Sequence, residues 1–242
     1  MVEKKALIDI WVYLSGSPLL ALFITLCAYQ AGLFINQKVK GNPLANPVAI
    51  AVILVSVFIS VIGMPYATYF SGAQFVHFLL GSATVALAVP IYRGLNALRG
   101  RIFPLFLSLV TGALVSIVSS VGIAHQLGAG PAITNAMFGK SVTAPIAMGI
   151  AERIGVSPTL TAIYSVMTGI LGAVLARYVL NIIGISAWWQ RGFAIGVGAH
   201  GIGTSRAFSV HPEAGIYASL AMGAHGILGA VMIPVLYHLF HP

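Results

Sequence analysis

Long apolar runs separated by short polar connections dominate the hydrophobic pattern of this chain. Each run has about 20 residues, the length that an α-helix needs to cross the hydrocarbon core of a bilayer. The runs are continuous rather than alternating, which favours helices over the strands of a membrane β-barrel. We predict an all-α, polytopic membrane protein with about eight membrane segments, some of them broken or re-entrant. The expected segments span about 16–36, 46–64, 74–93, 102–124, 132–152, 158–183, 187–206 and 214–239.

Composition and loop charges support this interpretation. Charged residues make up only 7% of the 242 residues, whereas a soluble domain needs about 25%. The chain therefore needs the lipid bilayer as its solvent. Its net charge of +8 comes from basic residues that cluster between apolar runs, as orientation signals do, so no nucleic-acid partner is expected. The loops near Lys38, Arg99 and Arg153 are predicted to be cytoplasmic, and the short connections predict a single membrane domain over residues 1–242.

The sequence offers little for enzyme chemistry. It has four acidic residues and one cysteine, Cys27, and it carries no HExxH, CxxC or Walker motif. Paired carboxylates for acid–base catalysis are not available from so few acids. We therefore predict no catalytic residues, no cofactor and no metal, and we expect that the protein is not an enzyme.

A motif recurs along the chain at a fixed spacing. "TGALVSIV" begins at Thr111, "TGILGAVL" at Thr168 and "HGILGAVM" at His225, so that successive copies start 57 residues apart. Two full crossings in each unit would give parallel repeats, whereas one crossing plus a re-entrant element would give inverted repeats. Chance matching in a chain rich in Gly, Ala and Leu is a third interpretation. The sequence leaves all three open.

Lys140 is the most unusual polar residue in the apolar segments. Ionisable groups at membrane depth are costly, and they usually face a cavity or a partner. Gly139 and Pro145 flank Lys140 and both weaken a helix. A break at this place would leave backbone N–H groups beside a cation, which is how an anion site is built. The plain alternative is a lysine whose aliphatic stem reaches the nearer membrane surface.

A second polar stretch, "GAHGIGTSRAF" at 198–208, has similar features. Its histidine is equally a candidate for simple packing, its arginine for a helix-end anchor, and the hydroxyls of "GSAT" at 81–84 for helix–helix contacts. Hydroxyl donors and cations around a compact cavity would suit a small anionic substrate. The predicted substrate-binding residues are Lys140, Ser141, Thr143, Ser82, Thr84, His200, Thr204, Ser205 and Arg206.

Several long stretches resemble the LrgB family of membrane proteins. They are "GKSVTAPIAMGIAERIGVSPTLTAIYSVMTGILGA" (139–173), "GAHGIGTSRAF" (198–208) and "ASLAMGAHGILGAVMIPV" (218–235), with "LLGSATVALAVPIYR" (79–93) similar to an earlier signature. The resemblance implies a multi-pass protein of the bacterial inner membrane that works with a small LrgA-like membrane partner. It also implies two competing functions. Bacterial members were named as holin-like or antiholin-like modulators of murein hydrolase activity, whereas plant plastid relatives look like glycolate/glycerate translocators.

The residue chemistry favours transport over the alternative. A carrier needs cations and hydroxyl donors around a cavity, and the polar stretches supply both. We therefore predict a transporter of small 2-hydroxy or 2-oxo monocarboxylates of the glycolate, glycerate and pyruvate class. The alternative is a holin/antiholin-like modulator of autolysis. In either case we expect a homo-oligomer.

Overall fold

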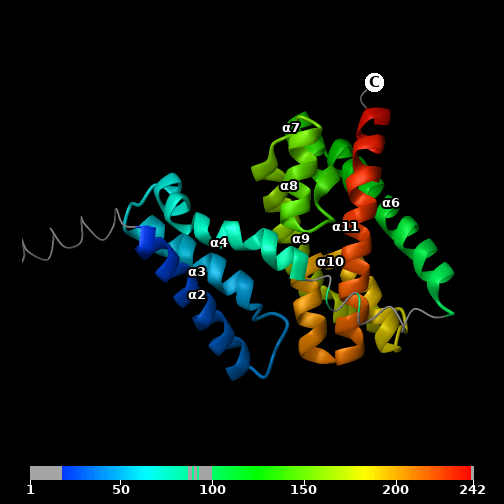
Figure 1. Ribbon diagram of the computed structural model, residues 1–242, viewed down its shortest axis with the longest axis horizontal. Helices are drawn as coiled ribbons and strands as arrows, with labels where there is room; N and C mark the ends of the chain where they lie inside the picture. The colour runs from blue at the N-terminus through cyan, green and yellow to red at the C-terminus, as the bar shows by residue number, and fades with distance from the viewer. Residues whose placement is uncertain (1–17, 87–88, 90–91, 93–99, 241–242) are drawn as a thin grey trace, which may run out of the picture. The chain divides into compact units, whose positions relative to one another are not determined.

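The computed structural model describes residues 18–86, 89, 92 and 100–240, and the chain divides into two compact units, Met1–Thr84 and Val85–Pro242. All regular elements in these described ranges are helical, which confirms the all-α prediction (Figure 1). The elements are α2 (Pro18–Lys38), α3 (Pro47–Val61), α4 (Tyr66–Ala86), α6 (Ile102–Gln126), α7 (Pro131–Ala136), the 3₁₀ turn η2 (Met137–Gly139), α8 (Ala144–Arg153), α9 (Pro158–Ile182), α10 (Trp188–Val210) and α11 (Pro212–Phe240).

Four of these helices, α2, α6, α9 and α11, are long and apolar enough to cross a membrane. Large apolar side chains such as Phe103, Phe106 and Ile227 are exposed on α6 and α11, whereas small residues such as Ala113 and Ala218 are fully buried. An apolar outer surface around a core of small side chains is what a lipid solvent permits. The protein is therefore a helical membrane protein, but the expected count of eight crossings is not confirmed.

The first unit contains α2, α3 and most of α4. Gly32 lets α2 approach the start of α3 closely, because a Cβ there would lie 2.5 Å from the carbonyl oxygen of Pro47. The side chain of Asn46 caps α3 by accepting a hydrogen bond of 2.9 Å from the backbone N–H of Val48. The connection between the expected segments 46–64 and 74–93 is shorter than predicted, because α4 already begins at Tyr66.

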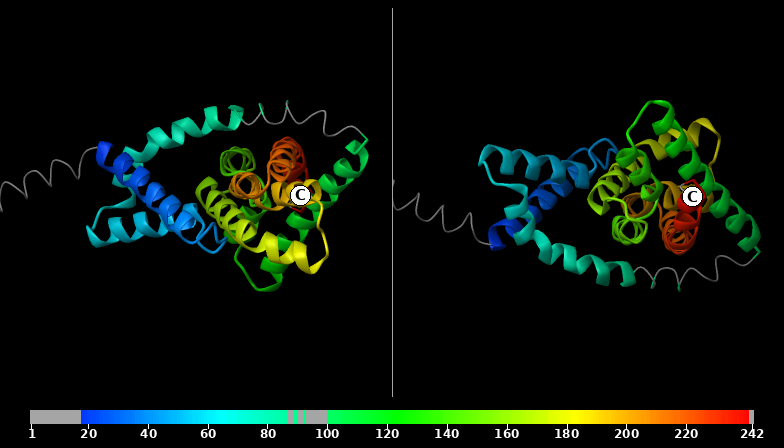
Figure 2. Two further views of the ribbon diagram at one scale, coloured as in Figure 1. Left: turned by 90° about the horizontal axis from the view of Figure 1, so that it is seen from below. Right: turned by 90° about the horizontal axis from the view of Figure 1, so that it is seen from above.

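In the second unit, α10 first runs parallel to α11. Gly192 packs against the backbone of Ala214, and one turn later Gly196 packs against the backbone of Ala218. Both partners advance along the chain together, so the two helices run in the same direction here. Figure 2 shows α10 and α11, in orange and red, side by side and seen close to their axes.

The second half of α10 runs back along α11. Thr204 Oγ1 lies 3.8 Å from the sulfur of Met222, and Phe208 packs against Gly215, so the partners now advance in opposite senses. The reversal is at His200, whose φ of 37° and ψ of −131° are not helical. A positive φ at a residue with a side chain is strained, and it has to be held by its surroundings. α10 is therefore a hairpin of two short helical arms.

The ends of α10 confirm the reversal. The rings of Trp188, its first residue, and His211, just after its last, stack with centroids 4.7 Å apart. The two ends of α10 therefore lie at the same end of the second unit. The segment expected to cross at 187–206 is instead re-entrant.

The segment from α7 to α8 forms a second hairpin. Phe138 packs edge-on against Tyr237 near the end of α11, with ring centroids 5.4 Å apart, and Val142 packs against Gly229 two turns deeper. From this tip α8 returns to the short turn that begins α9 at Pro158. The expected crossing at 132–152 is thus re-entrant as well, and the prediction of broken or re-entrant helices is confirmed.

The two hairpins enter from opposite ends of three long helices. Along α6, Leu105 packs with the α10 side and Ile117 with the α7–α8 side. Along α9 the order is reversed, because Thr161 meets Gly139 near the start and Gly172 meets α10 further on. α6 and α9 are therefore antiparallel, and each is followed by one hairpin. This arrangement is an inverted repeat, the alternative that requires a re-entrant element in each unit.

The glycines of the repeated motif explain why it recurs. Gly112, Gly169 and Gly226 hold the same position in the three copies. A Cβ at these places would lie 3.2 Å from Val197, 2.6 Å from His200 and 2.6 Å from Ile146, respectively. Each copy thus uses its glycine to bring a long helix against a hairpin, which is a packing requirement that chance matching would not produce.

This topology changes the expected orientation of the loops. The loop at Arg153 lies at the end where α6 stops and α9 starts, opposite to Arg101 at the start of α6, so the two cannot share a side. In a chain with Cys27 replaced by alanine, single cysteines at Leu127 and Thr159 should react with an impermeant maleimide from one side, and a cysteine at Ser186 from the other. Labelling of Leu127 and Thr159 from opposite sides would show that 132–152 crosses after all.

Candidate functional site

The tips of the two hairpins meet beside the middle of the long helices, where they form a cluster of polar side chains. The ammonium Nζ of Lys140 donates a hydrogen bond of 3.0 Å to Ser116 Oγ on α6. Ser165 on α9 contacts both tips: its hydroxyl donates to the carbonyl of Val142 over 2.6 Å, and its carbonyl accepts a 2.8 Å bond from His200 Nε2. We call Ser116, Lys140, Thr143, Ser165 and His200 the polar junction.

The sequence dictates the two breaks differently. Pro145 and the extended conformation of Thr143 start α8 anew after the 3₁₀ turn, as Gly139 and Pro145 predict. At the second break the hydroxyl of Thr204 donates a hydrogen bond of 2.7 Å to the carbonyl of His200. The first break is caused by helix-breaking residues, whereas the second depends on tertiary contacts.

Four buried polar atoms near the hairpins have no hydrogen-bond partner within the described chain. They are Ser141 Oγ, His200 Nδ1, Ser219 Oγ and His225 Nε2. Each such atom costs about 1–3 kcal/mol relative to a satisfied one. His225 nevertheless has a fixed orientation, because its Nδ1–H donates to the carbonyl of Val197 over 3.0 Å. Polar groups retained at this cost in a membrane protein indicate a functional element.

The structure brings five of the nine predicted site residues together. Lys140, Ser141 and Thr143 lie at the first tip, with His200 and Thr204 at the second. A Cβ on Gly201 would lie 3.7 Å from Thr143 Oγ1, which places the two tips in contact.

Two further predicted residues of the second unit, Ser205 and Arg206, lie away from the tips. Ser205 is exposed, and Arg206 lines a separate pocket at the entrance of α10. Ser82 belongs to the first unit, where its hydroxyl donates 2.9 Å to the carbonyl of Leu79 on an exposed helix face. The side chain of Thr84 lies outside the described residues. A ligand-binding role for the nine residues stays a prediction.

Sequence analysis did not identify Ser116 and Ser165 as part of the site. A signal was present for Ser165, since Thr161, Ser165, Gly169 and Ala173 are spaced four apart and form one buried stripe on α9. Small and polar residues at this spacing mark a helix face that meets other helices closely.

Comparison with known proteins identifies the family. A family model described as the LrgB-like family matches residues 25–239. The chain belongs to the LrgB family. The resemblance seen in its motifs is confirmed over nearly the whole sequence.

The similarity to curated LrgB-family relatives extends over almost the full length of both chains. The holin-like protein CidB of Staphylococcus epidermidis is 27% identical over 222 residues, covering 92% of this chain and 96% of the relative. The holin-like protein CidB of Staphylococcus aureus is 25% identical over 223 residues, with 92% and 97% covered. The antiholin-like protein LrgB of Bacillus subtilis is 25% identical over 223 residues, with 92% and 96% covered. No solved structure matches the chain.

These relatives overturn the prediction of a monocarboxylate transporter, because they are named holin-like and antiholin-like. The physical source of the error lies in the hydroxyls and the histidine that suggested a substrate cavity. Thr204 bonds to the carbonyl of His200 at the helix reversal, and the ring of His200 is tied to the carbonyl of Ser165 on α9. A re-entrant hairpin needs such partners for its broken backbone whether or not a ligand binds.

Proposed function

We propose that this LrgB-family chain is a holin/antiholin-like protein that modulates murein hydrolase activity and thereby autolysis. The observation that carries the proposal is near-full-length similarity to relatives with holin-like and antiholin-like names. The protein acts in the inner membrane of a bacterium, and it acts without catalytic chemistry of its own.

The polar junction supports a role in membrane permeability. The two hairpins enter from opposite ends and meet at their tips. Along this path the tips alone separate the two sides of the membrane. Broken backbone at membrane depth is tolerated only where protein or a water-filled cavity surrounds it. Lys140 and the partnerless polar atoms near it make this the weakest part of the apolar barrier. A small change in how the tips pack would alter the leak of ions across the membrane.

Association with other membrane proteins is part of the proposal. The exposed apolar side chains on α6, α9 and α11 offer surface to lipid and to protein alike. We propose a small LrgA-like membrane protein as partner, together with self-association of this chain. Both would supply further helices around the polar junction.

The test is autolysis in a bacterium whose own LrgB-family genes are deleted. Expression of this chain, alone and with an LrgA-like protein, should change the rate of detergent-induced lysis and the murein hydrolase bands in a zymogram. The control is an empty vector at matched growth. Unchanged lysis and unchanged hydrolase activity, with the chain demonstrably in the membrane, would refute the proposal.

A further inference from the structure

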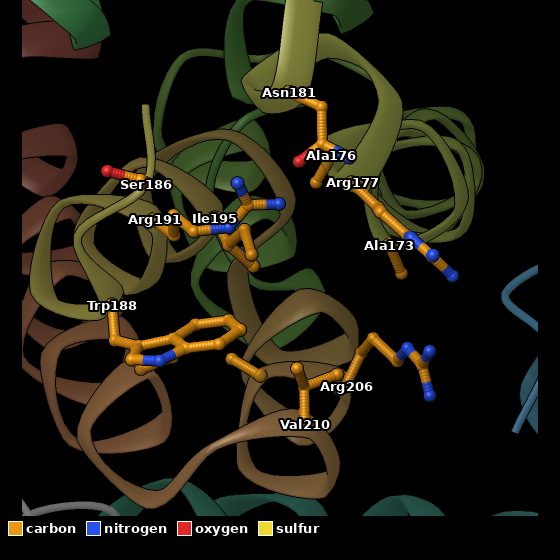
Figure 3. A pocket seen from close by; sticks show the side chains of 12 residues that line it. Ala173, Ala176, Arg177, Asn181, Ser186, Trp188, Arg191, Ile195, Arg206 and Val210 are labelled. Atoms are coloured by element: carbon orange, nitrogen blue, oxygen red, sulfur yellow. The ribbon is translucent and has the colours of Figure 1, made fainter. Parts of the chain in front are cut away.

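A second polar feature lies far along α9 from the polar junction. It is a cavity of about 410 Å³ between the last turns of α9 and the two arms of α10. Its polar lining consists of Arg177, Asn181, Ser186, Trp188, Arg191 and Arg206 (Figure 3). We call these six residues the arginine pocket.

The three arginines come from three separate segments. Arg177 belongs to α9, Arg191 to the first arm of α10 and Arg206 to its second arm, and all three line the cavity (Figure 3). None of the residues that line the cavity is acidic. Arg177 and Arg206 repel one another electrostatically. Cations gathered at a cost without a carboxylate among them indicate that the pocket receives an anion.

Two of the three arginines, Arg191 and Arg206, are held by contacts to neighbouring groups. Arg191 donates a 2.6 Å hydrogen bond from Nη1 to the carbonyl of Ile185, and its guanidinium lies 5.7 Å from the centre of the Trp188 ring. Trp188 is itself stacked on His211. Arg206 donates over 3.3 Å to Ser209 Oγ. Each of these contacts uses only part of a guanidinium, which has five N–H donors.

The location of the pocket favours a lipid. The arginine pocket lies at the end of the second unit where both ends of α10 are found. Trp188 and Trp189 lie at the same end. At the same end Arg101 donates 2.9 Å to the hydroxyl of Tyr217 and lies over the ring of Trp189. Tryptophans mark the headgroup level on either side of a membrane, and clustered arginines are typical of the cytoplasmic side. Basic pockets between membrane helices at this level bind phospholipid headgroups.

The size and lining of the cavity point the same way. About 410 Å³ is far more than a bare phosphate ion fills, and it is within the range of pockets for small molecules. Ala173, Ile195 and Val210 add an apolar wall that could contact the glycerol and acyl parts of a lipid. Guanidinium groups match the geometry of a phosphate by donating paired hydrogen bonds. We propose that the arginine pocket binds the phosphate group of an anionic phospholipid.

Native mass spectrometry of the full chain in an uncharged detergent tests this. Dioleoylphosphatidylglycerol should bind more tightly than dioleoylphosphatidylcholine. Arg206→Gln should weaken phosphatidylglycerol binding about fivefold, and Arg177→Gln with Arg206→Gln about 25-fold. Arg153→Gln, an exposed arginine at the opposite end, is the matched control and should bind like the parent. Melting temperatures without added lipid check that all variants are folded.

The outcomes separate the sources of the phosphate. Arginine-dependent binding that millimolar inorganic phosphate does not displace supports a phospholipid. Displacement by inorganic phosphate alone would support a phosphate site for a soluble ion and overturn the lipid as its source. Equal binding in the parent and in folded Arg177→Gln/Arg206→Gln would overturn the proposal, as would an equal loss in Arg153→Gln.

Discussion

Replacing Gly196 by valine is expected to lower the free energy of unfolding by about 3 kcal/mol, one of the two largest effects that we predict. Gly196 is where the first arm of α10 presses on α11, and a Cβ there would collide with the carbonyl oxygen of Ala218. That oxygen is part of a helix backbone, so it cannot rotate away as a side chain could. The hairpin would have to separate from α11. Unfolding of the purified protein in mixed detergent micelles would measure the loss in free energy.

Gly198 provides the matched control in the same arm. An added Cβ at Gly198 meets nothing within 4 Å. Gly198→Ala should therefore be neutral or stabilise the protein by up to about 1 kcal/mol, because alanine favours the helix. If the Gly196→Val protein is as stable as the parent, the parallel pairing of α10 and α11 would be wrong. The hairpin in α10 would then be wrong as well.

The sequence predicts the three long helices of the second unit closely. The expected segments at 102–124, 158–183 and 214–239 correspond to α6, α9 and α11, with ends that differ by at most two residues. These helices are uninterrupted and apolar on most sides, so their hydropathy alone defines them. Proline or glycine near their ends marks the boundaries.

Hydropathy could not distinguish a hairpin from a crossing. The segments at 132–152 and 187–206 are as long as a membrane span, and a hairpin of two short arms contains the same number of residues. At the first of them Gly139 and Pro145 do indicate a break. At the second the chain reverses at His200, a residue type that does not by itself predict a positive φ, and its ring packs closely on Gly169 of α9.

The site shows the same limit at the level of function. Lys140 and the hydroxyls at the two breaks were recognised from their types, but types alone do not say what a hydroxyl binds. In the structure Ser165 donates to the carbonyl of Val142 and Thr204 donates to the carbonyl of His200, and both carbonyls lie at the two breaks. The polar inventory of a binding site and that of a helix reversal are therefore alike in sequence, and only the contacts separate them.

Replacing Lys140 by methionine is expected to abolish the effect of the chain on autolysis while making the folded protein more stable. Lys140 is half-buried at the polar junction, where its ammonium donates to Ser116 and, within the described residues, makes no ion pair with a carboxylate. A charged group in the middle of a spanning helix costs about 3 kcal/mol. The partial exposure of Lys140 reduces the expected gain to about 1–2 kcal/mol. Methionine keeps the length and removes the charge, which seals the weakest part of the barrier.

Detergent-induced lysis and unfolding of the same variants would measure both effects. Lys38→Met is the matched control, since Lys38 is exposed at the end of α2, and it should leave lysis unchanged. Lys140→Arg keeps the charge and should retain part of the activity, although its larger planar group fits the junction less well. Stability and activity moving in opposite directions is the result that a functional lysine requires. Parental lysis by a folded Lys140→Met protein would instead make Lys140 a membrane anchor, and would remove the polar junction from the mechanism.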